Sequence, residues 1–236
     1  MTPIRPATTL PSDELRRLFD AGAPIYNRVD ALGSFGTGLR YRQDALGRAG
    51  LQPGRQVIDV ACGTGLMSLA AIRQTQGNVR IVGVDPSPGM LGYAPVQLPL
   101  ELRKGSAAAL PVDSASSDFL MMGYALRHVP DWPAAFAEFA RVLRPGGHLL
   151  MLELTCPSHR FGRLVFHSYF GGFLPALGFV ATGRAQAWRL YRYYWRSMVF
   201  ARSPESVVQT LAQAGFCDVT HNLRHGFLSE YTAIRR

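Results

Sequence analysis

The stretch VIDVACGTGLMSLA, residues 57–70, decides the fold. A short apolar run typical of a buried strand leads into Gly63 and Gly65 and then into a helical pattern. A glycine pair at this place lets the backbone turn sharply and approach a ligand, while the helix that follows directs free N–H groups toward that ligand. The stretch therefore predicts a ligand site between a strand and a helix.

The pattern around this stretch predicts an α/β fold. Strands are expected at residues 55–61, 79–85, 101–107, 117–126 and 147–154, with helices at 65–75 and 133–143 between them. Alternating strands and helices form right-handed βαβ units and a parallel sheet that is buried on both faces. Two further strands, at 217–223 and 227–236, complete a doubly wound, mostly parallel, seven-stranded, Rossmann-like sheet.

The composition divides the chain into four segments. Residues 1–50 are expected to form a helical segment that covers the ligand site, with Ser12 capping its first helix, and residues 51–155 form the α/β core. Residues 156–202, rich in aromatic residues and arginine, are interpreted as a helical lid, too polar to span a bilayer. Residues 203–236 supply a helix capped by Ser203 and the last two strands.

Charge and cysteine content limit the partners. The 25 basic and 16 acidic residues give a net charge of +9, which favours anionic partners, and the basic residues gather in the lid. Three cysteines lie far apart and no histidines have a metal-ligand spacing, so we expect reduced thiols, no metal and a cytoplasmic location. The N-terminus has too little apolar length for a signal peptide.

The residues around the glycine turn select among its ligands. A phosphate-binding loop would need Gly-Lys-Ser/Thr where this chain has Gly65-Leu66-Met67, and a dinucleotide fingerprint would need a glycine at Ser68. Asp59, inside the preceding strand, would repel a pyrophosphate but attract a cationic amino acid. Asp85 ends the next strand, where it can accept from ribose hydroxyls. These charges predict S-adenosylmethionine as the cofactor.

At this point the sequence resembles the class I S-adenosylmethionine-dependent methyltransferases, and within them the ubiquinone/menaquinone biosynthesis C-methyltransferase family. IYNRVDALGSFGTGLRYR resembles that family's YDxxN...SFG segment, and VIDVACGTG and VDPSPGML match its first two cofactor motifs. ALPVDSASSDFL, YALRHVPD and VLRPGGHLLMLEL resemble the later motifs, and YRYYWRSM in the lid resembles YRYLAESI.

The resemblance implies roles for particular residues. Gly63, Thr64 and Gly65 would contact the amino-acid moiety, Asp85 the ribose, and Met90, with Pro86 before it, the adenine face. Ser106 and Ala107 would lie at the adenine edge, Gly123 at the fourth strand, and Tyr26 near the methyl-bearing sulfur. The chain departs from the family pattern at four places. Asn27 and Asp30 stand where the family usually has Asp and Asn, in that order, and Ser106 replaces an acid or amide. His128 replaces an asparagine, and the C-terminus lacks the usual signature.

Arg127 and His128 are the expected catalytic residues. Methyl transfer needs alignment and a competent nucleophile, and a phenol ring carbon becomes nucleophilic as its hydroxyl loses a proton. Arg127 could stabilise the developing phenolate, and His128 could take the proton. We therefore expect C-methylation of a small aromatic, phenol- or quinone-like acceptor. The lid would form an apolar pocket for it and contact an anionic membrane peripherally, at the inner face.

Several alternatives stay open. O- or N-methylation of an aromatic natural product uses the same fold, and a nicotinamide oxidoreductase is disfavoured by Ser68 and Asp59. A nucleic-acid methyltransferase is not expected, because Gly123-Tyr124-Ala125-Leu126 stands where an NPPY-type tetrapeptide would be. A protein that binds the cofactor or a lipid without turnover is a further alternative. Where the chain self-associates, a homodimer is the expected form.

Overall fold

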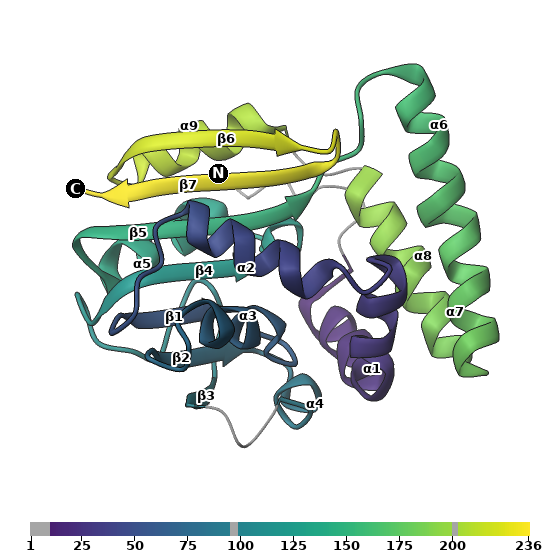
Figure 1. Cartoon of the computed structure of the whole chain (residues 1–236), viewed down its shortest axis with the longest axis horizontal. Helices are drawn as coiled ribbons and strands as arrows, with labels where there is room; N and C mark the ends of the chain where they lie inside the picture. Colours follow the sequence, from purple (N-terminus) through teal and green to yellow (C-terminus); the bar gives the residue numbers. More distant parts are fainter. Residues whose placement is uncertain (1–9, 95–98, 200–202) are drawn as a thin grey trace.

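A computed structural model describes residues 10–94, 99–199 and 203–236. Its seven strands form one sheet in the order β3-β2-β1-β4-β5-β7-β6 (Figure 1). Strands β1 to β5 run parallel, and β7 pairs antiparallel with both β5 and β6. The predicted doubly wound, mostly parallel seven-stranded sheet is confirmed. The strands are β1 Gln56–Val60, β2 Arg80–Asp85, β3 Leu100–Lys104, β4 Ser117–Gly123, β5 Leu143–Leu154, β6 Phe216–Arg224 and β7 Leu228–Arg235.

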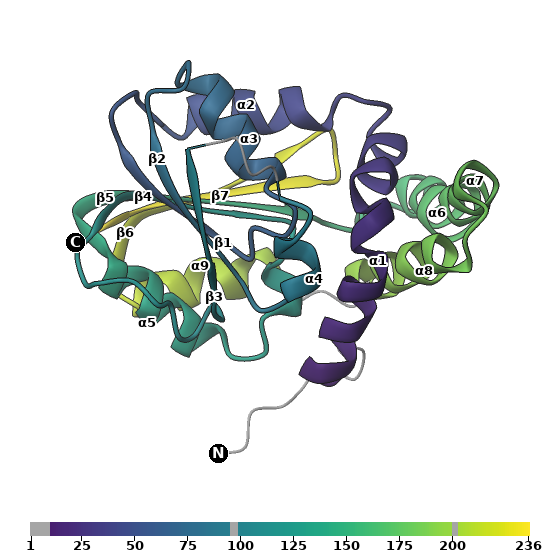
Figure 2. The ribbon, with the colours of Figure 1, turned by 90° about the horizontal axis from the view of Figure 1, so that it is seen from below.

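Helices cover both faces of the sheet, as Figure 2 shows. Alternate side chains of β4 point to opposite faces: Leu120 and Met122 pack with α5 (Trp132–Val142) and α9 (Pro204–Gln213). Phe119 and Met121 pack instead with α2 (Gly38–Arg48) and α3 (Leu66–Gln74). The middle of β4 is buried on both faces because residues 119–122 form an unbroken apolar run.

The parallel strands end at one edge of the sheet, and this edge carries the site. Because β1, β2, β4 and β5 run in the same direction, the turns that follow them meet there. Helix α1 (Ser12–Gly33) and the short helix α4 (Pro88–Leu91) lie beside this edge, and the lid helices stand beyond α1 (Figures 1 and 2).

The lid is a helical hairpin that packs on α1. Helix α6 (Arg160–Ser168) continues through a π-helical turn (Tyr169–Phe173) into α7 (Leu174–Thr182), and α8 (Ala185–Val199) returns alongside. Ile25 and Val29 of α1 form a small core with Leu174, Leu190 and Tyr191 of the lid. This core is separate from the two cores on the faces of the sheet.

Two local predictions can be compared with the structure. Ser203 caps α9 as predicted, because its side chain accepts from the Ser206 amide. Ser12 does not cap α1: the helix already begins at this residue, Pro11 occupies the cap position, and no side chain caps the end. Residues 1–9 of the expected N-terminal segment and 200–202 of the expected lid lie outside the described residues.

The prediction that the lid is too polar for a bilayer was wrong on composition. The continuous helix Arg160–Thr182 has 23 residues and contains an 18-residue window with a mean hydropathy of 1.5, so it is long and apolar enough to cross a membrane by those two measures alone. Only 22% of its apolar window is buried within the molecule. The arginines flank the apolar run of this helix rather than interrupt it, which is why a view of the whole segment underestimated its hydropathy.

Candidate active site

A cavity of about 530 Å³ lies at the carboxyl edge of the sheet and is called here the cofactor cavity. It brings together nearly all of the residues that the sequence predicted for the cofactor and for catalysis. Among that set, Gly65 does not line it. The predicted residues that do are Tyr26, Asp59, Gly63, Thr64, Asp85, Pro86, Met90, Ser106, Ala107, Gly123, Arg127 and His128.

The two glycines of the turn have different tasks. Gly63 has a φ of 56°, and a Cβ on it would lie 3.0 Å from Met90 Cε, so glycine keeps this part of the cavity open. Its amide donates to Asp85 Oδ2 at 2.8 Å. Gly65, with a φ of 80°, donates its amide to the Cys62 carbonyl at 2.8 Å and starts α3. Gly65 therefore closes the turn, which explains why it does not reach the cavity.

Asp59 is a buried carboxylate with one unused oxygen. Its Oδ2 accepts from the Ser68 amide at 3.0 Å and from Ser68 Oγ at 2.6 Å. Its Oδ1 is buried and has no hydrogen-bond partner among the described residues. Burial is the main cause that raises the pKa of Asp59 to about 7, although the two bonds from Ser68 act in the opposite direction. An ionised Asp59 at this place needs a cation.

Asp85 is held in a fixed orientation at the end of β2. Its Oδ1 accepts from the Ser87 amide and its Oδ2 from the Gly63 amide, both at 2.8 Å. Burial raises the pKa of Asp85 to about 6 against the effect of these two bonds. Each carboxylate oxygen can accept a second hydrogen bond, so the side chain retains capacity for a ligand hydroxyl.

Helix α1 is tied across the cofactor cavity by two polar contacts. Asp20 Oδ1 accepts from Ser87 Oγ at 2.5 Å and from the Gly89 amide at 2.8 Å, which joins α1 to α4. Thr64 Oγ1, in the glycine turn, donates to Asn27 Oδ1 at 2.6 Å. The sequence did not identify Asp20 or the Thr64–Asn27 pair, because both join segments that lie far apart along the chain.

A second cavity, of about 770 Å³, lies between α1, α2 and the lid and is called here the acceptor cavity. Its lid side is mostly aromatic and aliphatic. The two cavities share five lining residues, so they meet at one place, the junction. The shared residues are Tyr26, Arg42, Tyr124, Arg127 and Tyr194. The sequence singled out Tyr26 and Arg127 but missed the other three, although Arg42 lies within the quoted N-terminal segment and Tyr194 within the quoted lid segment.

Arg42 belongs to the wall of the junction. Its guanidinium donates to both carboxylate oxygens of Asp30, at 3.2 and 2.5 Å, and its carbon lies 4.9 Å from the centre of the Tyr124 ring. This pairing accounts for the exchanged asparagine and aspartate in the N-terminal segment: Asn27 bonds the glycine turn, and Asp30 neutralises Arg42.

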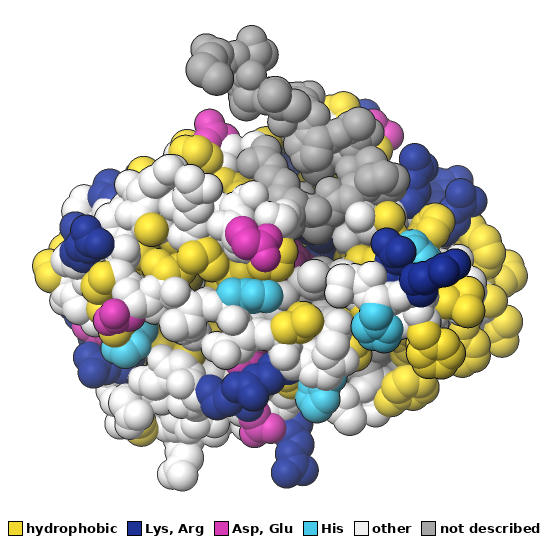
Figure 3. Space-filling model, turned by 90° about the horizontal axis from the view of Figure 1, so that it is seen from above, with side chains coloured by type: hydrophobic (Ala, Val, Ile, Leu, Met, Phe, Trp, Pro, Cys, Tyr) yellow, Lys and Arg dark blue, Asp and Glu magenta, His cyan; other side chains and the backbone are white. Residues whose placement is uncertain are grey.

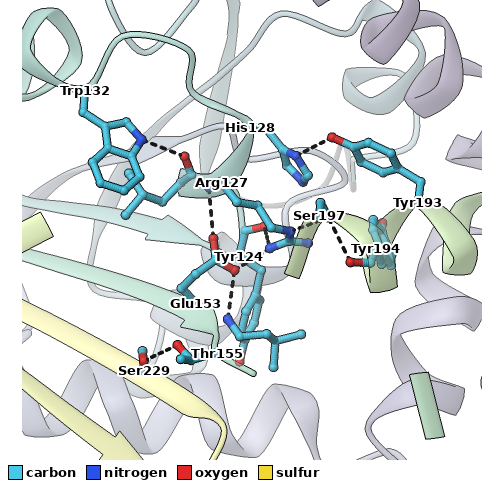
Figure 4. A network of polar contacts seen from close by, with 12 residues as sticks. Tyr124, Arg127, His128, Trp132, Glu153, Thr155, Tyr193, Tyr194, Ser197 and Ser229 are labelled. Carbon is cyan, nitrogen blue, oxygen red and sulfur yellow. Dashed lines mark hydrogen bonds and ion pairs between the residues drawn. The ribbon is translucent and has the colours of Figure 1, made fainter. Parts of the chain in front are cut away.

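Arg127 is the centre of a buried polar network (Figure 4). Its Nη1 donates to Glu153 Oε1 and, at 2.6 Å, to the Tyr124 carbonyl, while its Nε donates to Ser197 Oγ at 3.1 Å. The Arg127 amide also donates to Glu153 Oε2, at 3.1 Å. No hydrogen bond joins Nη2 to a described residue, so one donor of the guanidinium is available at the junction. Glu153 was not among the predicted site residues.

His128 lies beside Arg127 but borders only the cofactor cavity. Its Nδ1 and the Tyr193 hydroxyl are 2.7 Å apart (Figure 4), and its Nε2 is buried without a partner among the described residues. Burial, and then the charge of Arg127, hold the pKa of His128 well below its ordinary value. The imidazole is therefore neutral at neutral pH, as a proton acceptor must be before the reaction.

The site places the buried Asp59 carboxylate beside an apolar cavity, and comparison with known proteins identifies the family of the chain. The model of the ubiE/COQ5 methyltransferase family matches residues 7–235. The chain belongs to that family. It is an S-adenosylmethionine-dependent methyltransferase.

Curated relatives match along most of their length. A demethylmenaquinone methyltransferase of Symbiobacterium thermophilum is 32% identical over 218 residues, which cover 89% of this chain and 87% of the relative. That of Thermus thermophilus is 34% identical, over 84% of this chain and 91% of the relative. The ubiquinone/menaquinone biosynthesis C-methyltransferase of Geobacter sulfurreducens is 31% identical, over 89% and 83%.

Solved structures share the fold. Phosphoethanolamine N-methyltransferase 2 of Haemonchus contortus, in complex with S-adenosyl-L-methionine, gives a TM-score of 0.68 at 15% identity, covering 96% of this chain and 60% of that one. A methyltransferase of Aquifex aeolicus gives 0.62 at 16% identity, covering 97% and 100%. At these identities the likeness concerns the fold and not the acceptor.

Proposed function

We propose that this enzyme methylates a ring carbon of a phenol or hydroquinone that carries an apolar substituent, as in the maturation of a quinone. One observation carries the proposal: the apolar acceptor cavity and the cofactor cavity share Arg127 as a lining residue, and Nη2 of this cation donates to no described residue. Its 770 Å³ lies within the range of cavities that enclose a small organic ligand. The names of the relatives, demethylmenaquinone methyltransferase among them, support a quinone acceptor.

The cofactor would be held by the residues that line its cavity. When bound, S-adenosylmethionine supplies an activated methyl group on a sulfonium. The unused Asp59 Oδ1 fits the ammonium of the amino-acid moiety, because it is a buried acceptor that needs a cation. Asp85 would accept hydrogen bonds from the ribose hydroxyls, and Met90 would cover the adenine. Gly63, which has no side chain, would let the ligand lie close to the backbone.

The remaining predicted contacts follow from their places in the same cavity. Pro86, Ser106 and Ala107 border it near β2 and β3, and Thr64 borders it within the glycine turn. Gly123 makes room in another way, since a Cβ there would lie 2.5 Å from Met67 Cγ. Tyr26 borders both cavities, as a residue near the reacting methyl group would.

Arg127 and His128 would activate the acceptor. Glu153, the Tyr124 carbonyl and Ser197 fix the guanidinium, so its free Nη2 can stabilise phenolate charge with little rearrangement. The neutral His128 can take the phenol proton on Nε2 when its Nδ1–H donates to Tyr193. Because His128 borders the cofactor cavity, the acceptor oxygen would have to reach past Arg127 to meet it.

Methyl transfer to a synthetic acceptor tests the proposal. The enzyme is incubated without oxygen with S-adenosylmethionine labelled with ¹³C in its methyl group and a 2-prenyl-1,4-dihydroxynaphthalene, and NMR locates the new methyl group. We expect it on the free ring carbon beside a hydroxyl. A methyl on oxygen, or turnover only with amines, would overturn C-methylation while leaving the cofactor assignment intact.

The lid would also place the enzyme on an anionic membrane surface. Between Cys156 and Val199 the chain has six arginines and no acidic residue, and those arginines form no ion pair with a described residue. Figure 3 shows hydrophobic side chains gathered with arginines at the lid end of the molecule. Among the exposed ones are Phe161 and Val180, 73% and 80% exposed. Phe161 also borders the acceptor cavity, so a prenyl chain could enter from the membrane.

Flotation with vesicles tests the membrane contact. Wild-type enzyme should float with phosphatidylglycerol-containing vesicles at low salt, and less at high salt or with phosphatidylcholine alone. Phe161→Glu and Val180→Glu should reduce flotation. The control Leu223→Glu changes a residue of β6 that is 50% exposed but lies outside the lid. Equal loss in the control, or no flotation of wild type, would contradict the proposal.

A further inference from the structure

Tyr194 of α8 borders both cavities. The hydroxyl oxygen is buried and forms no hydrogen bond with a described residue. Tyr26 raises the pKa of Tyr194 through its charge and through a contact between the two hydroxyls, but this contact falls outside the geometry of a formed hydrogen bond, so a ligand oxygen can replace it. A buried hydroxyl without a partner lowers stability, so its presence at a binding site points to a ligand.

Two neighbouring tyrosines on the same helix differ from Tyr194 in this respect. Tyr191 donates its hydroxyl to the Val29 carbonyl at 2.7 Å, and the Tyr193 hydroxyl lies 2.7 Å from His128 Nδ1. In the lid segment YRYYWRSM these two residues match the tyrosines of the related family's YRYLAESI, whereas Tyr194 stands where that segment has leucine. Helix packing at this position therefore does not require a hydroxyl.

The surroundings make Tyr194 a donor at the junction. The guanidinium carbon of Arg127 lies 5.6 Å from the centre of the Tyr194 ring. An acceptor ring that reaches the junction thus meets the free Arg127 donor and the Tyr194 hydroxyl together. Burial, followed by the effect of Tyr26, raises the pKa of Tyr194 well above its ordinary value, so the phenol keeps its proton and can donate it to a hydrogen bond.

We infer that Tyr194 determines specificity by donating a hydrogen bond to an oxygen substituent of the acceptor ring. This inference rests on the proposed function and deepens it, because it requires an oxygen on the ring edge that faces α8. The acceptor class is therefore an oxygenated aromatic ring, with its apolar substituent directed into the lid. A purely hydrocarbon ring would leave the Tyr194 hydroxyl unpaired and would bind less well.

Binding of two probes to wild type and Tyr194→Phe tests the inference. The probes are 1,4-dihydroxynaphthalene and naphthalene, added without oxygen to enzyme saturated with S-adenosylhomocysteine, with Kd measured by calorimetry. Tyr194→Phe should weaken binding of the dihydroxy probe by about 3- to 10-fold and leave naphthalene binding unchanged. Its affinity for S-adenosylhomocysteine should be unchanged, and its Tm equal to or above that of wild type.

Tyr191→Phe is the matched control, because it removes a satisfied hydroxyl from the same helix and cavity. It should lower Tm and leave the ratio of the two Kd values unchanged. Three outcomes would overturn the role assigned to Tyr194 without touching the proposed function. Tyr194→Phe could weaken binding of both probes equally, leave binding of both unaltered, or lower Tm as much as the control does. Failure of wild type to bind either probe would overturn the proposed acceptor class, and the assignment with it.

Discussion

Asp59→Asn is expected to stabilise the ligand-free enzyme at pH 8 and to weaken cofactor binding. Burial raises the pKa of Asp59 from 3.8 to about 7, a shift of about three units. Each unit corresponds to ~1.4 kcal/mol, so holding the ionised group in the folded protein costs roughly 4 kcal/mol above pH 7. Asparagine removes that cost, but its NH₂ group takes the place of Oδ1 and is itself left unpaired, which offsets part of the stabilisation. We therefore expect the unfolding free energy to rise by ~1 to 4 kcal/mol.

The sign of the pH dependence is distinctive. Since the folded-state pKa lies above the unfolded one, Asp59 binds a proton more tightly in the folded chain, and its contribution to stability is lost as pH rises toward 7. The difference in unfolding free energy between variant and wild type should therefore grow from pH 4 to pH 7 and then level off. Asp85, with a pKa of about 6, gives wild type and variant a similar further decline.

Urea unfolding at pH 5, 6, 7 and 8 measures the difference, and calorimetry with S-adenosylhomocysteine at pH 7.5 measures the affinity. Loss of a hydrogen bond to a charged group should raise Kd by about 10-fold or more. Asp118→Asn is the control of opposite sign: partial burial of Asp118 opposes ionisation, but the Gln56 amide and Arg144 outweigh it and lower its pKa. A difference for Asp59→Asn that does not change with pH would refute the reasoning.

Three further changes test other parts of the site. Glu153→Gln leaves the buried Arg127 without its counter-charge, so the unfolding free energy should fall by ~3–5 kcal/mol. The kcat should also fall, with little change in the Kd of the cofactor. Unchanged stability in urea would contradict the pairing. Gly123→Ala places a Cβ 2.5 Å from Met67 Cγ and should lower the unfolding free energy by ~1–3 kcal/mol. The double variant that also carries Met67→Ala should lose less stability, and denaturant titration of both variants measures the difference. Asp20→Asn weakens the contacts of α1 with Ser87 and Gly89, so S-adenosylhomocysteine should leave the enzyme faster. Stopped-flow measurements give this rate. An unchanged rate would mean that α1 does not limit release.

The cofactor cavity could be predicted from the sequence because its chemistry is local. Asp59 lies in β1, Gly63 in the turn that follows β1, and Asp85 at the end of the adjacent β2, so parallel topology alone brings them to one edge. Gly65 shows the limit of such reasoning: a glycine in a binding motif can serve the turn itself, and only the hydrogen bond to Cys62 reveals this. Tyr26 and Arg127 could be located by resemblance, since each lies in a quoted motif.

The acceptor cavity could not be predicted in the same way. Its junction combines residues from α1, α2, the turn after β4, and α8, and no spacing along the chain encodes such a meeting. Glu153 illustrates the point, because it looks like an ordinary polar residue near a strand end until the fold places it against Arg127. The apolar character of Arg160–Thr182 was underestimated for a different reason, because the arginines on either side of the apolar run lower the mean hydropathy of the whole segment.

Two pairs of positions at which this chain departs from the family's motifs differ in their contacts. Asn27 and Asp30 exchange two residue types, yet each has a protein partner, so the exchange conserves the contacts of the wall and need not alter the acceptor. His128 and Tyr194 differ: each replaces a residue of another kind, and His128 Nε2 and the Tyr194 hydroxyl are buried without a hydrogen bond to any described residue. Unpaired buried groups persist where a ligand completes them, so the substitutions at these two positions, rather than the exchanged pair, should distinguish this enzyme's acceptor from those of its relatives.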